Sequence, residues 1–251
     1  MNAQAHIKQR SPGMATTQPL LLMVKIAELL ANPARFFHPD HMSTATGGLA
    51  QEQFAAFCQT QTIGKRLNAA LACELGVSAI DLQPAAIASP DVAQICNLVI
   101  APDSAIEAFL SQVTAVRLQQ AIRNCVLKAD REQVRGVLGD AAYNTALREA
   151  PFFFADLADA SVVHFDASAG LGAGAATTHS YVASIDKGLA QIFAWRMPKS
   201  FTETEVSLDD TQLRLFARLL ASKGPQAGKG RAGWKFIASK ISTFGCRRAL
   251  A

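Results

Sequence analysis

The sequence has 251 residues, of which half are apolar and 7% aromatic. This length and apolar content supply a buried core and exclude global disorder. Many alanines and leucines with few aromatics favour helices over sheet, so we expect an all-α fold, an irregular multi-helix globular domain. The net charge of +4 is unevenly distributed: residues 1–210 hold fifteen basic and twenty acidic residues, whereas residues 211–251 hold nine basic and no acidic ones.

The N-terminal residues 1–17 are polar and predict a disordered leader, with Met14 as an alternative start to Met1. The apolar run Leu20–Val24 is far shorter than the roughly 20 residues that cross a bilayer. It also lacks a signal-peptide cleavage site, so we expect a soluble, cytoplasmic protein. The five cysteines are widely spaced and form no CxxC pair, which argues against a zinc site or disulfide framework. Four of them, Cys58, Cys73, Cys96 and Cys125, lie in apolar helical patterns and are expected to be buried, reduced thiols.

Apolar residues recur at helical spacing through residues 18–222, which predicts one helical domain. The first helix is expected to end at Asn32-Pro33, with a loop after it, because proline cannot continue a helix. Gly76 is expected to terminate the next helix in a left-handed conformation.

The strongest helical signal runs from Asp103 to Leu127 and predicts one long helix. Ser104 and Glu107 fit a capping box at its start. Asp130 is expected to cap the next helix, and Ser207 the last one, which Gly224 and the following proline would stop.

A Gly/Ala-rich stretch at about residues 166–179 predicts a flexible loop, followed by a helix over 181–195. It contains the pattern G-x-G-x-x-A at residues 170–175, which in dinucleotide-binding folds opens a helix directly after a strand. Here four residues separate the preceding apolar run from the first glycine, and no βαβ pattern surrounds it. We therefore interpret the glycines as loop composition and expect no nucleotide cofactor.

The remaining motifs predict no catalytic residue and no metal. His38 and His41 flank Asp40, but Pro39 prevents a helical alignment of the two imidazoles and a third ligand is not evident. The segment 224–230 differs from a P-loop in spacing and lacks the serine or threonine that binds magnesium. No serine or cysteine lies in a nucleophile motif, so the sequence predicts a protein that is not an enzyme.

Three stretches, NPARFFHPDHM (32–42), VRGVLGDAAYNTALREAPFF (134–153) and GLAQIFAWRMPKSF (188–201), occur in an order and spacing that resemble the SctK/YscK family of type III secretion proteins. Together they cover roughly residues 18–220, and the Gly/Ala-rich stretch and the basic tail lie outside the pattern. The resemblance implies a non-enzymatic, mostly helical adaptor of the cytosolic sorting platform. It implies two partners, the cytoplasmic domain of the inner-membrane ring protein (SctD-like) and the pod protein (SctQ-like). The protein would then be cytoplasmic and peripheral to the inner membrane, reaching it only through these partners.

Residue by residue, the resemblance points to a small set of positions, of which His38, Tyr143, Arg148 and Arg196 are the candidates for partner binding. Most matching residues are expected to be structural. The ring of Tyr143 would pack in the core. Arg148 and Arg196 would hold carbonyl groups at the C-termini of helices.

The basic C-terminal tail, residues 223–251, is expected to be loosely ordered, either as a solvated terminus that keeps the protein soluble or as a binding segment, which is a different hypothesis of function. Its lysines and arginines are interleaved with Trp234 and Phe236, a composition that suits a nucleic acid or an anionic surface. On the adaptor hypothesis nucleic acid is not expected as a partner. The sequence leaves open which surface binds which partner, whether the tail orders on binding, and the oligomeric state.

Overall fold

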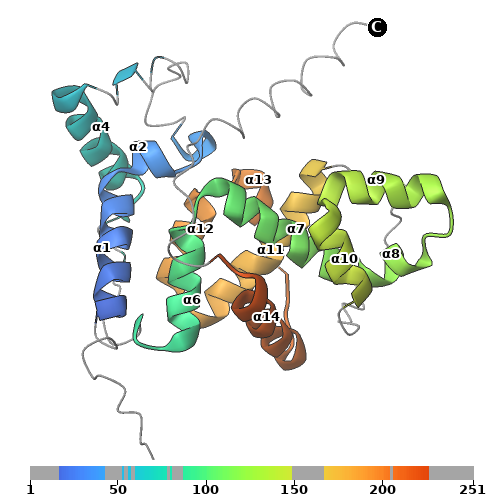
Figure 1. The fold of residues 1–251 in the computed structure, drawn as a ribbon. Helices are drawn as coiled ribbons and strands as arrows, with labels where there is room; N and C mark the ends of the chain where they lie inside the picture. The colour runs from blue at the N-terminus through green and yellow to red at the C-terminus, as the bar shows by residue number, and fades with distance from the viewer. Residues whose placement is uncertain are drawn as a thin grey trace, which may run out of the picture.

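The structure is a computed structural model, and every regular element in the part of the chain that it describes is a helix (Figure 1), so the expected all-α class is confirmed. The described residues are 17–42, 60–77, 87–148, 167–203 and 206–225, with residues 53, 56, 57 and 80. In chain order the elements are α1 (Thr17–Ala31), α2 (Pro33–Phe36), the 3₁₀ turn η1 (Pro39–His41), α4 (Gln61–Glu74), α6 (Pro90–Val99), α7 (Asp103–Arg117), α8 (Gln119–Asn124), α9 (Lys128–Leu138), α10 (Asp140–Arg148), α11 (Ala167–Ile185), α12 (Lys187–Trp195), α13 (Lys199–Thr202) and α14 (Asp210–Lys223).

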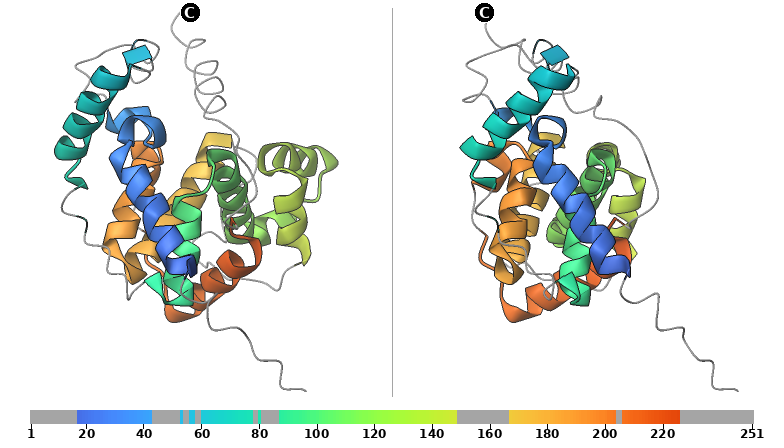
Figure 2. Two further views of the ribbon diagram at one scale, coloured as in Figure 1. Left: turned by 60° about the vertical axis from the view of Figure 1, so that its left-hand side comes forward. Right: turned by 90° about the vertical axis from the view of Figure 1, so that its left-hand side faces the viewer.

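The largest hydrophobic cluster, here called the main core, lies among helices α1, α6, α7, α11, α12 and α14 (Figure 2). Each helix contributes apolar side chains spaced three or four residues apart, so one stripe faces inward. Aromatic rings join distant parts of the chain. The ring of Phe216 in α14 stacks on Tyr181 in α11, with centroids 4.3 Å apart, and meets Phe109 in α7 edge-on at 5.8 Å. These contacts tie the last described helix to the centre of the fold.

A smaller cluster, here called the distal cluster, is formed by α8, α9 and α10 against one side of α7. Figure 1 and the left view of Figure 2 separate these helices from α1, with the main core between them. Its buried side chains are Ala115, Leu118, Ala121, Ile122, Val134, Leu138, Ala142, Tyr143 and Ala146. Helix α7 therefore contributes to both clusters, one on each side.

The Gly/Ala-rich stretch is not a flexible loop, and that prediction is wrong: it forms most of the 19-residue helix α11. The small residues are there because α11 packs closely against α7. A Cβ atom at Gly174 would overlap the carbonyl oxygen of Leu110 and approach the Thr114 Oγ1 to 2.7 Å. Helix α11 begins at Ala167, so the G-x-G-x-x-A pattern lies inside a helix and not in a turn at its N-terminus.

The helix expected over 181–195 is also divided differently. Helix α11 continues to Ile185, and Asp186 starts α12 as its N-cap, accepting a 2.8 Å hydrogen bond from the backbone N–H of Leu189. A short polar side chain at this point competes with the helix backbone, which explains the break.

The single helix expected from Asp103 to Leu127 is two helices, because the chain bends at Leu118. Its start also differs from the predicted capping box. Pro102 occupies the N-cap position and no side chain caps the helix. Asp103, the first helical residue, instead forms an ion pair with Arg196, as described below.

Two further caps were placed wrongly. Leu127, three residues before Asp130, is the N-cap of α9. Asp209 and not Ser207 caps α14, where it forms a full capping box with Gln212. Asp and Ser are both good N-caps, so composition alone did not separate them.

The predicted ends of three helices are confirmed. Helix α1 ends at Ala31, before Asn32-Pro33, although a short helix and a 3₁₀ turn follow where a loop was expected. Gly76 follows α4 with a φ of +68°. Gly224 is the C-cap of α14.

Several expectations concern residues outside the described part: the leader, nearly all of the basic tail, Cys58 and most of the segment 224–230. Among the other cysteines, Cys96 is fully buried as expected, and burial raises the pKa of its thiol to about 12. Cys73 is exposed and Cys125 half-buried, so the expectation that they are buried is wrong.

Within the described helices, none has by itself the length and apolar character to cross a membrane. Helices α6 and α7 meet that criterion only as a pair, and the pair is bent by 119°.

Candidate interaction site

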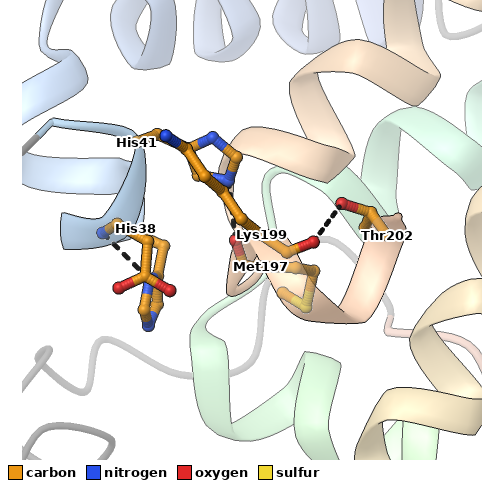
Figure 3. A network of polar contacts seen from close by, with 6 residues as sticks. His38, His41, Met197, Lys199 and Thr202 are labelled. Atoms are coloured by element: carbon orange, nitrogen blue, oxygen red, sulfur yellow. Dashed lines mark hydrogen bonds and ion pairs between the residues drawn. The ribbon is translucent and has the colours of Figure 1, made fainter. Parts of the chain in front are cut away.

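The first and third stretches of the family resemblance lie against each other at the end of α12 (Figure 3). The backbone N–H of His38 donates to the carbonyl of Trp195 at 2.7 Å. The Phe37 ring packs on the Trp195 ring with centroids 5.1 Å apart. His41 places its Nε2 2.9 Å from the carbonyl oxygen of Met197. Residues 156 positions apart in sequence are thus joined into one polar and aromatic contact.

His38 caps the turn η1 through its imidazole. Its Nδ1 accepts a 3.3 Å hydrogen bond from the backbone N–H of Asp40, which requires the neutral ring. The Asp40 carboxylate is 3.4 Å from the same nitrogen and favours the protonated ring instead. Burial outweighs the carboxylate, and the pKa of His38 is lowered. The neutral, capping form is therefore the one the fold selects at neutral pH.

His41 is half-buried, and burial also lowers its pKa, although the hydrogen bond with the carbonyl of Met197 opposes that shift. The nearby Lys199 lowers the pKa further by charge repulsion. Figure 3 shows Lys199 at the start of α13, with its carbonyl accepting from Thr202. Both histidines thus serve the fold as neutral hydrogen-bonding groups.

Arg196 forms a clamp in the interior, where it is 2% exposed. Its Nη1 donates to the carbonyls of Val99 at 2.5 Å and Ala101 at 2.6 Å, at the C-terminus of α6. Its Nη2 forms an ion pair with Asp103 at the start of α7. One guanidinium therefore fixes the corner between α6 and α7 and joins it to α12.

The expected role of Arg196 in holding helix C-terminal carbonyls agrees with this geometry. Burial raises the pKa of Asp103, and the Arg196 guanidinium opposes that shift. His38, 8% exposed, and Arg196 are both engaged within the chain, so their positions favour a structural role over contact with a partner. Among the described residues no group of three or more histidine, cysteine, aspartate or glutamate side chains could hold a metal ion.

The other two candidate residues lie in the distal cluster, away from this contact. Tyr143 is 9% exposed and packs its ring there, as expected. Arg148 is the last residue of α10 and is exposed. The guanidinium that reaches a carbonyl at this helix end is that of Arg123, 3.4 Å from the Leu147 oxygen. Of the four candidates, only Arg148 is available at the surface.

Two apolar surfaces were missed by the sequence analysis. The first, here called the α1 face, is the solvent side of α1 and consists of Leu20, Leu21, Val24, Ala27 and Ala31. Its three large side chains are 62%, 53% and 64% exposed. The opposite side of α1 buries Leu22, Ile26 and Leu29 in the main core. The signal was present, because the run 20–24 is apolar on all sides of the helix, whereas packing one face needs only one stripe.

The second surface, here called the α8–α9 tip, is formed by Val126 and Leu127, which are 79% and 65% exposed. Arg131 holds this connection: its Nε donates to the carbonyl of Cys125 at 2.9 Å and its Nη2 to that of Val126 at 2.8 Å. Two apolar side chains are thus presented to solvent on a braced backbone. Exposed apolar residues on an ordered support are typical of protein interaction sites.

The comparisons with known proteins add no relative: no family model, no curated protein and no solved structure matches the chain.

Proposed function

We propose that this chain is a non-enzymatic, two-sided helical adaptor that joins two other proteins through separate apolar surfaces. The observation that carries the proposal is the pair of exposed surfaces, the α1 face and the α8–α9 tip. They belong to different clusters and lie on opposite sides of the main core (Figure 1). A protein that links two partners needs two independent contact sites held at a fixed separation.

The sequence resemblance suggests what the two partners are. They would be the cytoplasmic domain of a type III secretion ring protein and the pod protein of the cytosolic sorting platform. The shared helix α7 supports this role, because it contributes buried side chains to both clusters and so connects them directly. A rigid connector transmits position from one partner to the other, which a flexible linker does not.

The experiment is a binding measurement with each partner separately, using two matched substitutions in the full chain. Val24→Asp places a charge on the α1 face, and Val126→Asp places the same charge on the α8–α9 tip. Each buried apolar anchor that is lost weakens binding by about 10- to 100-fold. We expect each variant to lose one partner and keep the other.

Circular dichroism and thermal unfolding serve as the control that both variants stay folded. The proposal is contradicted if neither wild-type partner binds, or if folded Val24→Asp and Val126→Asp both bind both partners as the wild type does.

The charge asymmetry favours a second candidate, binding of a nucleic acid or an anionic surface through the basic tail. Residues 211–251 hold nine basic residues and no acidic residue. If the basic tail makes the binding contact, deleting residues 223–251 abolishes binding, and the affinity of the full chain falls steeply as the salt concentration rises. The adaptor proposal instead predicts partner binding with weak salt dependence.

A further inference from the structure

The α1 face is unusual for a surface helix, because it exposes three large apolar side chains and two alanines within twelve residues, Leu20 to Ala31. Glu28 is an exposed charged residue on this side of the helix, and Lys25, one turn after Leu21, is half-buried at its edge. Such a stripe is typical of a helix that is covered by another helix. The question is what covers it.

The α1 face by itself is too small for a stable complex between free molecules, so a partner protein or a second copy of this chain would have to contact other elements as well. A 15-residue helix is about 22 Å long and about 10 Å across, so one face covers roughly 220 Å² in projection. Stable complexes between free partners bury about 800 Å² on each side. A segment of the same chain needs far less contact, because tethering gives it an effective concentration in the millimolar range.

The C-terminal segment has the sequence pattern that fits this face. Trp234, Ile237, Ile241 and Phe244 are spaced by three, four and three residues, which places them on one side if the segment is helical. This stripe would extend about 15 Å, against about 16 Å from Leu20 to Ala31. Lys240 would fall beside it.

Reach and charge agree with the same pairing. Helices α1 and α14 both pack on α6, so the chain leaves the described fold from a helix that shares a neighbour with α1. Eight residues separate Pro225 from Trp234 and span up to about 28 Å when extended. Residues 226–251 contain six basic and no acidic residues, whereas residues 1–210 carry a net charge of −5, and Glu28 lies on the face itself.

We infer that residues 234–244 form an amphipathic helix on the α1 face, with Trp234, Ile237, Ile241 and Phe244 against Leu20, Leu21 and Val24. One consequence rests on the proposed function: the tail would occupy one of the two partner surfaces until a partner displaces it. The contact itself exists without any partner and is measured without one.

The test is hydrogen exchange of the full chain, followed in peptides that cover residues 230–246. We expect these amides to exchange at least about 10-fold more slowly than in the isolated peptide of the same sequence. Val24→Asp, on the α1 face, should remove this protection. Val126→Asp is the matched control: it introduces the same charge at another exposed valine, in the α8–α9 tip, and should leave the protection intact.

A reciprocal pair of variants tests the tail. Ile237→Asp with Ile241→Asp should raise the exchange of α1, whereas Ser239→Asp with Thr243→Asp, which changes charge equally off the stripe, should not. The inference is overturned if the wild-type tail exchanges at the free-peptide rate or if Val24→Asp leaves it protected. It is also overturned if sedimentation shows a concentration-dependent dimer that Val24→Asp dissolves, because a second copy then occupies the face. Loss of both partners in the binding experiment with tail protection intact would remove the proposed function and leave this contact standing.

Discussion

The main core and the distal cluster both bury apolar side chains between helices, but they differ in the kinds of side chain that they bury. The main core combines large aromatic rings with a buried ion pair between Arg196 and Asp103. The distal cluster is built largely from alanines and medium-sized aliphatic side chains, with Tyr143 as its ring. Its clamp, Arg131, is exposed and bonds only to carbonyl groups of the loop that it braces.

This difference has a consequence for how each region is stabilised. The apolar area of three short helices, α8, α9 and α10, is too small to fold alone, so the distal cluster depends on α7, which the main core holds. Both regions have a buried side chain that donates to backbone carbonyls across elements: Arg196 in the main core, and Gln119, whose Nε2 donates to the Ala146 carbonyl at 2.8 Å, in the distal cluster. The main core adds the buried ion pair with Asp103. The stability of the distal cluster therefore depends on the main core, which holds α7, while its α8–α9 tip presents Val126 and Leu127 to solvent.

The largest expected effect comes from removing the buried guanidinium. Arg196→Met keeps most of the volume but leaves Asp103 as a buried carboxylate without its cation and frees the carbonyls of Val99 and Ala101. We expect the free energy of unfolding to fall by about 3–5 kcal/mol, measured by urea denaturation.

Arg131→Met is the matched control, because this arginine also donates to two carbonyls but is exposed. We expect a loss of about 1 kcal/mol or less. Equal losses for the two variants would contradict the contrast between the two regions. Adding Asp103→Leu to Arg196→Met should recover part of the stability, since the uncompensated charge is then gone.

A smaller effect is expected from a single methyl group between α7 and α11. In Gly174→Ala the new Cβ overlaps the carbonyl of Leu110, so the helices must separate, at a cost of about 1–3 kcal/mol. Gly136 in α9 has open space where a Cβ would lie, so Gly136→Ala should stabilise the protein by about 0.5–1 kcal/mol. Thermal unfolding of both variants measures the difference, and opposite signs are the expected outcome.

Gly174 also shows where reasoning from the sequence fails. The helical class and the ends of α1, α4 and α14 were predictable, because periodic apolar residues and Pro or Gly act locally. The three glycines of the Gly/Ala-rich stretch lower its local helix propensity, and close packing on α7 compensates for them. Such a contact between residues roughly 60 positions apart leaves no local signal.

The candidate site was predictable to a similar degree. Arg196 was correctly linked to helix C-terminal carbonyls, but its burial and its pairing with Asp103 depend on α12 meeting the α6–α7 corner. The excess of apolar residues on α1 was visible in the sequence, but the sequence does not say which apolar stripe of α1 the core will use, because that depends on how the other helices pack.

The smallest expected effect is a pH dependence that separates the two regions. His38 and His41 have pKa values below the ordinary 6.5, because burial disfavours their charged forms. Below pH 6.5 the unfolded chain therefore binds more protons than the folded one. The contribution of the two neutral histidines to the free energy of unfolding is therefore complete above pH 6.5, and it is lost as the pH falls through the lower pKa values of the folded state. We expect a loss of about 1 kcal/mol in the anchoring of α1, α2 and η1 between pH 7.5 and 5.5.

Hydrogen exchange at the two pH values, corrected for the intrinsic rate, reads out this loss for each region. Protection should fall in α1, α2 and η1, and it should persist in α8, α9 and α10, because residues 118–148 contain no histidine. In the variant His38→Gln with His41→Gln, the pH dependence of α1 should flatten even though its protection at pH 7.5 is reduced. If α1 and α9 lose protection in parallel as the pH falls, protonation acts on the whole fold, and the histidine contact at the end of α12 is not what anchors the N-terminal helices.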